Sequence, residues 1–525
     1  MRLRRWLPCV LAWLVVPAPD LAAQLAPIGV PRGLVRLDLR VSFDDASRRF
    51  RDGSTEDYGA DFASPALGSD RIASLRAAEA RIAQVLGRPE YRLDLGRATA
   101  NGHATVSSIE VGLAYGLTSR LTIFGSVPIV RARAELALGL DPAGANAGLN
   151  PADPALGTAA GRDQAAQFFE QFDAALATLG AKLAAGDYDA DPSLRALAQH
   201  TLASGTALRD GLRAIVQEPA TASPFLPTQG SEEGIQLAAG LAALQATLGG
   251  PLGVPNFTAG APLPSAPLTR DELERFLTAP SGPIGGRPLE ARTIFLAGDT
   301  DVGASYTWLD RWDPTGRRRG IRSVLEARVR LPTGYLDLPD HFFDLGSGER
   351  QLDVGLRLVT DVAAGRWGAR LSAGFTRQFA STRLRRVGRP DQPFTPAARL
   401  TNLRRDPGDV IAIGLQPYLR IAPGLGLHLA GSYWRKGTDR YTYATAADSI
   451  PGVSAAEMEV GTEAGTMVVG GGVSYTSPGR LAPNGRGLPI EARWTYETTV
   501  HGTGERTPLF RGTRAELRIY HRLFR

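Results

Sequence analysis

The sequence predicts an all-β transmembrane barrel of about 12 antiparallel strands, with a large α-helical insert on its extracellular side. Three observations support this fold class: a two-residue alternation of side chains, an N-terminus typical of secreted proteins, and connections that alternate between short and long. The alternation is clearest in Ile294–Trp308, and side chains on a strand alternate between its two faces. The apolar face is expected to hold Ile294, Leu296, Val302, Ala304, Tyr306 and Trp308, and the polar face Asp299, Asp301, Ser305 and Thr307.

The first residues have the pattern of a secretory signal peptide, with cleavage expected near Ala23 or Gln24. A basic start (Arg2, Arg4, Arg5) precedes an apolar run from Trp6 to Val16. An N-terminal membrane anchor is the alternative, but the run is too short to span a bilayer and two prolines follow it closely. The mature chain would then be exported to a Gram-negative-type outer membrane, without the one cysteine, Cys9.

Eleven further segments show comparable alternation, and each is near the length that a tilted strand needs to cross a bilayer. The twelve predicted strands are Val35–Phe43, Ile109–Tyr115, Leu121–Val130, Ile294–Trp308, Leu325–Leu331, Leu352–Leu358, Trp367–Phe375, Ile411–Ile421, Leu425–Tyr433, Met467–Tyr475, Ile490–Tyr496 and Ala515–Ile519.

The connections between these strands alternate in length, as in barrels with short periplasmic turns and long outer loops. The short ones are Thr118–Arg120, Asp310–Gly320, Ala363–Arg366, Pro423–Gly424 and Ser477–Gly487. The long ones are Ala46–Gly102, Glu135–Arg292, Thr333–Glu349, Arg386–Pro407 and Arg440–Glu463. A soluble β-sandwich or propeller would also alternate, but it would not need aromatic residues near strand ends. Such residues are Trp308, Trp312, Tyr433, Tyr475, Trp494, Tyr496 and Phe524.

The face expected to point inward carries charges of both signs. Burying these charges without partners would cost several kcal/mol each, so they must be paired across strands, hydrated by a lumen, or both. A narrow polar passage and a closed, salt-bridged interior both remain possible. The candidate lumen-facing residues are Arg36, Arg40, Glu110, Asp299, Asp301, Glu326, Arg328, Arg330, Arg357, Arg370, Arg420, Glu491 and Arg493.

Two of the long connections have helical rather than strand periodicity. Ser69–Gly87 predicts one helix, and three apolar stripes begin at Phe168, Leu194 and Leu237 in the larger connection. Helix-start signals at Asp191, Ser231 and Thr269 support this interpretation. The predicted division is a signal peptide (1–23), three strands with a helical loop at 47–102 (24–135), the helical insert (136–291) and nine strands (292–525). The insert could cap the barrel or fold partly into its lumen.

Neither catalytic nor metal-binding patterns stand out. The six histidines are scattered, and the sequence contains neither HExxH nor GxSxG. Asp187, Asp189 and Asp191 resemble the start of a calcium loop, but Pro192 replaces the required glycine. We therefore expect no catalytic residues, cofactor or metal.

The net charge of +6 does not predict a nucleic-acid partner, because basic and acidic residues alternate. The expected partners are outer-membrane lipid, the barrel-assembly machinery and a small-molecule solute, for a monomer.

Several barrel segments resemble a known family. They are Val111–Val130 (VGLAYGLTSRLTIFGSVPIV), Gly298–Trp308 (GDTDVGASYTW), Glu326–Gly334 (EARVRLPTG) and Leu345–Leu358 (LGSGERQLDVGLRL). They are similar to bacterial outer-membrane channel proteins associated with the phenol meta-cleavage pathway, distantly akin to long-chain fatty-acid transporters. The resemblance implies a channel or transporter for small molecules, including hydrophobic or aromatic compounds. A surface scaffold that displays the helical insert for adhesion and an outer-membrane barrel enzyme are the alternatives.

Overall fold

The structure is a computed structural model that describes residues 29–312, 319–422, 424–476 and 490–522. The predicted signal peptide, Phe524 and the turn at Ser477–Gly487 lie outside the described residues, as does most of Asp310–Gly320. None of the helices in the described part of the chain is long and apolar enough to cross a membrane.

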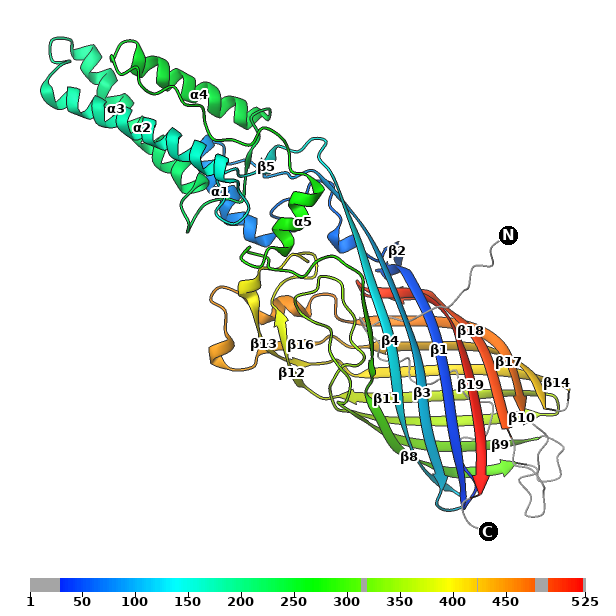
Figure 1. Ribbon diagram of the computed structural model, residues 1–525. Coiled ribbons are helices and arrows are strands. Elements are labelled where there is room, and N and C mark those ends of the chain that lie inside the picture. Colours follow the sequence, from blue (N-terminus) through cyan, green and yellow to red (C-terminus); the bar gives the residue numbers. More distant parts are fainter. Residues whose placement is uncertain (1–28, 313–318, 423, 477–489, 523–525) are drawn as a thin grey trace, which may run out of the picture.

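Twelve antiparallel strands form a closed barrel (Figure 1). The pairing of the last strand with the first closes the wall, with Leu39 opposite Leu517. Every predicted strand is confirmed. In order around the barrel, the strands are β1 (Leu34–Arg51), β3 (Arg97–Gly116), β4 (Leu121–Asp141), the interrupted pair β7 (Arg292–Ala297) and β8 (Thr300–Trp312), β9 (Gly320–Leu331), β10 (Asp353–Ala364), β11 (Trp367–Gln378), β14 (Val410–Ala422), β15 (Leu425–Lys436), β17 (Ala464–Thr476), β18 (Ile490–Thr503) and β19 (Thr507–Arg522).

The interruption between β7 and β8 reverses the side-chain alternation, so one part of the sequence prediction is wrong. On β4, Ile129 pairs with Ala297, whereas Ser126 pairs with Asp301. Residues 127–128 of β4 therefore face residues 298–300, and the extra residue is a bulge that exchanges the two faces. Ile294 and Leu296 pack inward, whereas Phe295 is 69% exposed on the outer surface.

Apolar side chains cover the outside of the barrel. The exposed set includes aromatic residues near the strand ends, among them Trp308, Trp367 and Tyr475. No second sheet covers these side chains in the described residues, so the wall is not one layer of a sandwich. The aliphatic members include Leu113, Ile123, Val302, Leu325, Leu356, Leu371, Ile411, Ile413, Leu415, Leu429, Val473 and Ile519. Such a surface is suited to lipid rather than to water.

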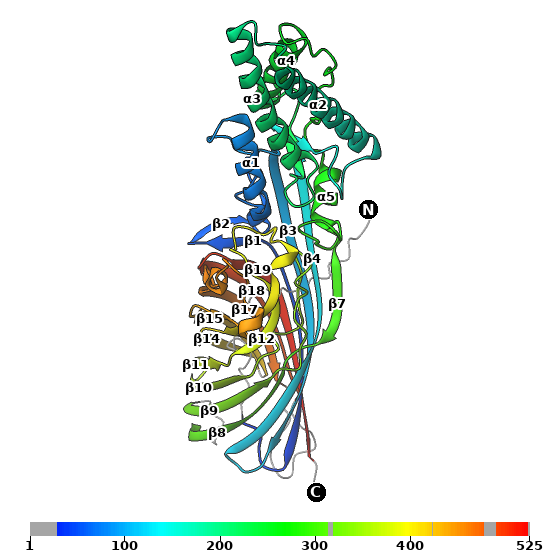
Figure 2. The same ribbon diagram turned by 90° about the vertical axis from the view of Figure 1, so that its left-hand side faces the viewer.

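The two ends of the barrel differ. At one end, which we call the turn end, the strands are joined by short turns such as Gly365–Arg366. At the other, the loop end, β3 and β4 continue far beyond the barrel as a paired ribbon (Figure 2). Because β4 continues to Asp141, the strand occupies residues 136–141, which the sequence analysis placed in the insert.

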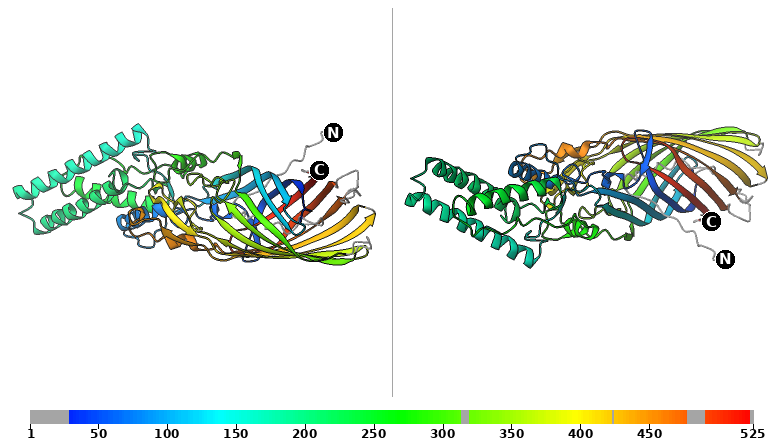
Figure 3. Two further views of the ribbon diagram at one scale, coloured as in Figure 1. Left: turned by 90° about the horizontal axis from the view of Figure 1, so that it is seen from below. Right: turned by 90° about the horizontal axis from the view of Figure 1, so that it is seen from above.

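The ribbon carries a helical arm that points away from the barrel mouth (Figures 1 and 3). We define the arm as α1 (Arg76–Leu86), α2 (Ala159–Ala185), α3 (Pro192–Val216), α4 (Glu232–Gly249) and α5 (Arg270–Thr278), with the two short strands β5 (Ala147–Leu149) and β6 (Phe225–Pro227). The predicted helices of the larger connection and their caps are confirmed, whereas the helix predicted over Ser69–Gly87 begins only at Arg76, after a 3-10 segment at 73–75. The side chains of Asp191, Ser231 and Thr269 accept hydrogen bonds from backbone amides at the starts of α3, α4 and α5.

The remaining elements lie at the loop end and were not predicted. A small sheet joins β12 (Ser381–Arg386), β13 (Leu400–Asp406) and β16 (Arg440–Tyr443), and β2 (Ser54–Asp57) pairs with the end of β1. Short 3-10 segments at 60–62, 73–75, 397–399, 446–448 and 455–459 complete the connections. The small sheet and its loops extend the barrel wall on one side of the mouth (Figure 1).

Candidate functional site

Strand register places opposite charges side by side on the inner face of the barrel. Arg40 on β1 lies opposite Glu110 on β3 and Glu516 on β19. Its guanidinium is 2.7 Å from the Glu110 carboxylate and 3.8 Å from that of Glu516. The Arg40 and Glu110 side chains keep 13% and 26% of their surface exposed. Because the wall is closed and both side chains point inward, this exposed surface belongs to the interior of the barrel.

A buried cluster continues from Arg40 toward the turn end. Its centre is Arg518, which is 2% exposed and lies 2.8 Å from Glu516, 3.4 Å from Asp38 and 3.7 Å from Glu491. Arg36 bonds the same Asp38 at 2.8 Å, and Arg493 stands opposite Glu516 in the register. Three of the predicted lumen-facing residues, Arg36, Glu491 and Arg493, therefore meet here.

The opposite side of the wall repeats this arrangement. Asp301 on β8 is 3.4 Å from Arg328 and 3.2 Å from Arg330 on β9. Glu326 is 3.0 Å from Arg357, and Arg370 is 2.5 Å from Asp361. Pairing of this kind satisfies charges that are removed from bulk water. The inner face is thus charge-paired throughout these strands, with hydration only where side chains remain partly exposed.

Two predicted lumen-facing residues have other surroundings. Arg420 lies at the turn end, with its guanidinium 5.4 Å from the centre of the Tyr418 ring. Asp299, in the interruption between β7 and β8, accepts hydrogen bonds from the backbone amides of Gly334, Glu349 and Arg350. It therefore anchors the connection between β9 and β10 to the barrel wall.

The segment before β1 narrows the turn end of the interior, a feature that the sequence analysis missed. The Val30 amide donates to the hydroxyl of Thr122 at 2.8 Å, and Val30 is 2% exposed. Gly29 lies beside the hydroxyl of Thr307, where an added Cβ would come within 3.2 Å. Thr122 and Thr307 alternate with exposed Ile123 and Tyr306, which places them on the inner face.

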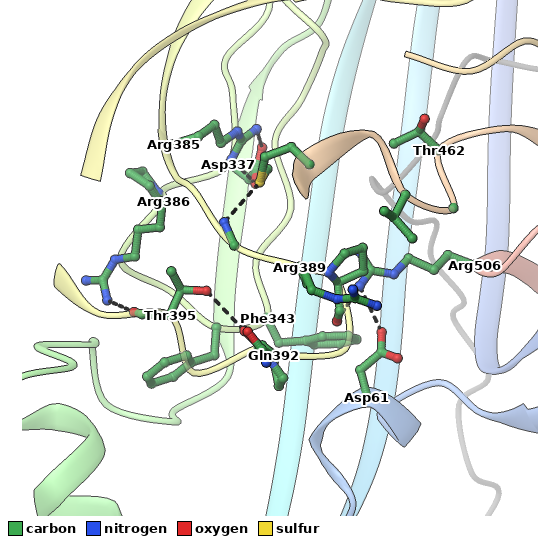
Figure 4. A pocket seen from close by; sticks show the side chains of 18 of the residues that line it. Asp61, Asp337, Phe343, Arg385, Arg386, Arg389, Gln392, Thr395, Thr462 and Arg506 are labelled. Atoms are coloured by element: carbon green, nitrogen blue, oxygen red, sulfur yellow. Dashed lines mark hydrogen bonds and ion pairs between the residues drawn. The ribbon is translucent and has the colours of Figure 1, made fainter. Parts of the chain in front are cut away.

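A cavity of about 260 Å³, which we call the outer pocket, lies at the loop end (Figure 4). Residues from five connections and several strand ends build it, including Asp61 before α1, Phe343 before β10 and Arg506 before β19. Its basic side chains are Arg49, Arg383, Arg385, Arg386, Arg389, Arg405, Lys436 and Arg506, and its acidic side chains are Asp61, Asp337, Glu349 and Asp439. Sequence reasoning missed this site, although the arginine-rich segment 383–389 was a signal for it.

Three of the four carboxylates that line the outer pocket are shared by two or more cations. Asp61 lies 2.6 Å from Arg49, 2.5 Å from Arg51 and 3.2 Å from Arg506. Burial alone would raise the pKa of Asp61, but the hydrogen bonds from Arg49 and the charges of Arg506 and Arg51 lower it to about 2. The pKa of Glu349 is lowered in the same way. Burial opposes its ionisation, but the charges of Arg405 and Arg383 hold its pKa well below the usual range.

The lowered pKa of Asp61 predicts acid sensitivity. Its stabilising effect is complete above the unfolded value of 3.8 and is lost as the pH falls through about 2, since protonation removes the partner of Arg49. Asp61→Asn should therefore cost about 2 kcal/mol at neutral pH, and wild type and variant should converge between about pH 4 and pH 2. Urea unfolding of refolded protein at several pH values measures this difference. Asp70→Asn, at an exposed carboxylate, is the control, and a gap for Asp61→Asn that persists at pH 2 would contradict the prediction.

Aromatic side chains form the apolar wall of the outer pocket. Phe343 contacts Tyr58 and Phe62 edge-on, with ring centres 5.2 and 6.5 Å apart. Phe342 lies 5.5 Å from Phe394, which is fully buried and joins this wall to the core of the helical arm. In the described part of the chain, no group of three or more His, Cys, Asp or Glu could hold a metal ion.

No protein-family model matches the sequence, and no curated protein matches it. Among solved structures, an outer membrane channel from Pseudomonas putida F1 is similar with 9% identity and a TM-score of 0.40, covering 95% of this chain and 100% of that one. The translocator domain of the autotransporter NalP from Neisseria meningitidis has 7% identity, a TM-score of 0.28 and coverages of 92% and 87%. A FadL homologue from Pseudomonas aeruginosa has 8% identity, a TM-score of 0.27 and coverages of 94% and 90%. The barrel architecture rests on this chain's own strand pairing.

Proposed function

We propose that this protein is an outer-membrane channel that lets small molecules cross by passive or facilitated passage. The observation that carries the proposal is the closed barrel whose charge-paired inner face stays partly exposed, below a pocket at the loop end. An apolar outer surface and a polar, partly hydrated interior are what a membrane-spanning barrel channel requires. The solved channel from Pseudomonas putida and the FadL homologue are named as an outer-membrane channel and a relative of FadL, which agrees with this proposal.

The orientation and partners follow from the same argument. With both termini on the periplasmic side, the short turns are periplasmic, and the outer pocket and helical arm are extracellular. The chain would be exported through a cleaved signal peptide, inserted by the barrel-assembly machinery and surrounded by outer-membrane lipid as a monomer.

Planar-bilayer recording of the refolded full-length mature protein tests the proposal. We expect small unitary currents, because paired charges narrow the interior. Removing one lumen pair with the double variant Asp361→Ala/Arg370→Ala should enlarge the unit current, since both partners leave together and no charge is stranded. The matched control is Asp189→Ala/Arg195→Ala, which removes a 3.0 Å pair on the helical arm and should leave the current unchanged. Absence of both current and solute flux in wild type and lumen variant would refute the proposal.

A further inference from the structure

The outer pocket contains more positive than negative charge. Eight basic and four acidic side chains line it. Adding the charged neighbours just behind the lining (Arg51, Glu56, Asp340, Asp391 and Glu505) gives nine basic against eight acidic groups. In one cluster, three cations share two carboxylates: Arg383, Arg405 and Lys436 with Glu349 and Asp439.

The excess charge falls on buried guanidinium groups. Arg383 is 5% exposed, and burial together with the neighbouring Arg405 lowers its pKa. An anion in the pocket would interact favourably with this excess positive charge, which is costly to hold away from bulk water.

The opposite wall of the pocket would favour an apolar group. Tyr58, Phe62, Phe342, Phe343 and Leu338 present rings and methyl groups to the cavity. In the view of Figure 4, Phe343 lies between Arg386 on one side and Arg506 on the other. An inorganic anion would leave the rings in contact with water, and a neutral hydrocarbon would leave the excess positive charge of the pocket without a counter-charge.

We propose that the outer pocket binds amphipathic organic monoanions, in which a carboxylate is attached to one aromatic or alicyclic ring, and that these are solutes the channel admits. This inference rests on the proposed channel function for its physiological meaning. The carboxylate lies against the basic side chains of the pocket, and the ring packs on Phe342 and Phe343. A cavity of about 260 Å³ has room for one ring with a short side chain, near the lower limit of small-molecule sites.

Isothermal titration calorimetry on the full-length mature protein in lipid nanodiscs tests the pocket chemistry. The probes are phenylacetate, its neutral analogue phenylacetamide, and acetate, which lacks the ring. We expect saturable binding of phenylacetate that is about tenfold or more tighter than binding of either other probe. Equal affinities of phenylacetate and phenylacetamide, or no saturable binding of phenylacetate, would overturn the inference.

Variants locate the binding to the pocket. Arg383→Gln should weaken phenylacetate binding about tenfold. Arg389→Gln removes a half-exposed side chain whose loss leaves the fold intact, and it should also weaken binding. Arg195→Gln removes an exposed arginine of the helical arm and should change nothing. Equal weakening by Arg195→Gln, or an unchanged affinity in Arg389→Gln and in folded Arg383→Gln, would overturn the assignment.

Bilayer recordings of the same preparations separate the two proposals. Currents without a preference for phenylacetate over phenylacetamide would leave the channel function standing and refute the ligand class. Charge-dependent binding of phenylacetate without any current or flux would support the pocket chemistry and refute the channel function.

Discussion

Replacing Arg518 with methionine is expected to lower the free energy of unfolding by about 3–5 kcal/mol. The guanidinium is buried among the carboxylates of Asp38, Glu491 and Glu516, which belong to three different strands. Methionine keeps much of the volume but supplies no positive charge, so these carboxylates would stay close together without their common partner. Urea titration of the refolded protein, followed by tryptophan fluorescence, measures the loss.

Two further variants make the Arg518 result specific. Arg518→Lys retains the charge but cannot direct several donors at once, so its loss should be smaller. Arg195→Met removes an arginine from an exposed pair with Asp189 and should cost less than about 1 kcal/mol. If the free energy of unfolding of Arg518→Met stays within about 1 kcal/mol of wild type, hydration by water rather than pairing with Arg518 stabilises the carboxylates.

The strands could be predicted because every second side chain of a membrane-spanning barrel strand faces outward and is apolar. Leu37, Leu39 and Val41 alternate with charged or polar neighbours, and no tertiary knowledge is needed to see it. The one error in alternation, at Ile294 and Leu296, comes from a bulge at residues 298–300. A single inserted residue leaves both flanking segments alternating normally, so only strand pairing reveals the exchange of faces.

Charged residues could be placed on strands, but their partners could not. Arg40 meets Glu110 and Glu516 because β1 is held between β3 and β19 in one register. Register depends on the whole closed sheet, and Glu516 lies at the far end of the chain from Arg40. Residues 136–141 also alternate, yet the sequence analysis assigns them to the insert, because β3 and β4 exceed the length that a bilayer needs.

The outer pocket lay beyond sequence reasoning for a similar reason. Asp61, Arg383 and Arg506 come from three separate connections, and their contacts arise only when the loop end assembles. The strands β12 and β13 carry arginines on both faces, so they lack the apolar alternation that predicts a strand. Local pattern thus predicts the apolar outer surface of the barrel, and long-range assembly determines the charged interior and the outer pocket.

Phe172→Ala is expected to destabilise the helical arm by about 3–5 kcal/mol while the barrel stays folded. Phe172 is completely buried on α2, stacked 4.5 Å from the Phe257 ring and 5.8 Å from that of Phe168. Alanine would leave a cavity that these rings cannot fill, because Phe168 is fixed on α2 and Phe257 is buried in the connection between α4 and α5. Far-ultraviolet circular dichroism during urea titration measures the loss of helix. The difference in gel migration between heated and unheated samples shows whether the barrel is still folded.

Two controls separate cavity formation from a general effect of substitution in the arm. Phe172→Leu conserves most of the volume and should cost less than about 1.5 kcal/mol. Ile235→Ala, at a side chain on α4 that is 58% exposed, should change stability little. The ribbon of β3 and β4 joins the arm to the wall through backbone pairing, and the rings in contact with Phe172 lie within the arm. If Phe172→Ala no longer migrates in the gel as a folded barrel, the two parts are not independent and unfold as one unit.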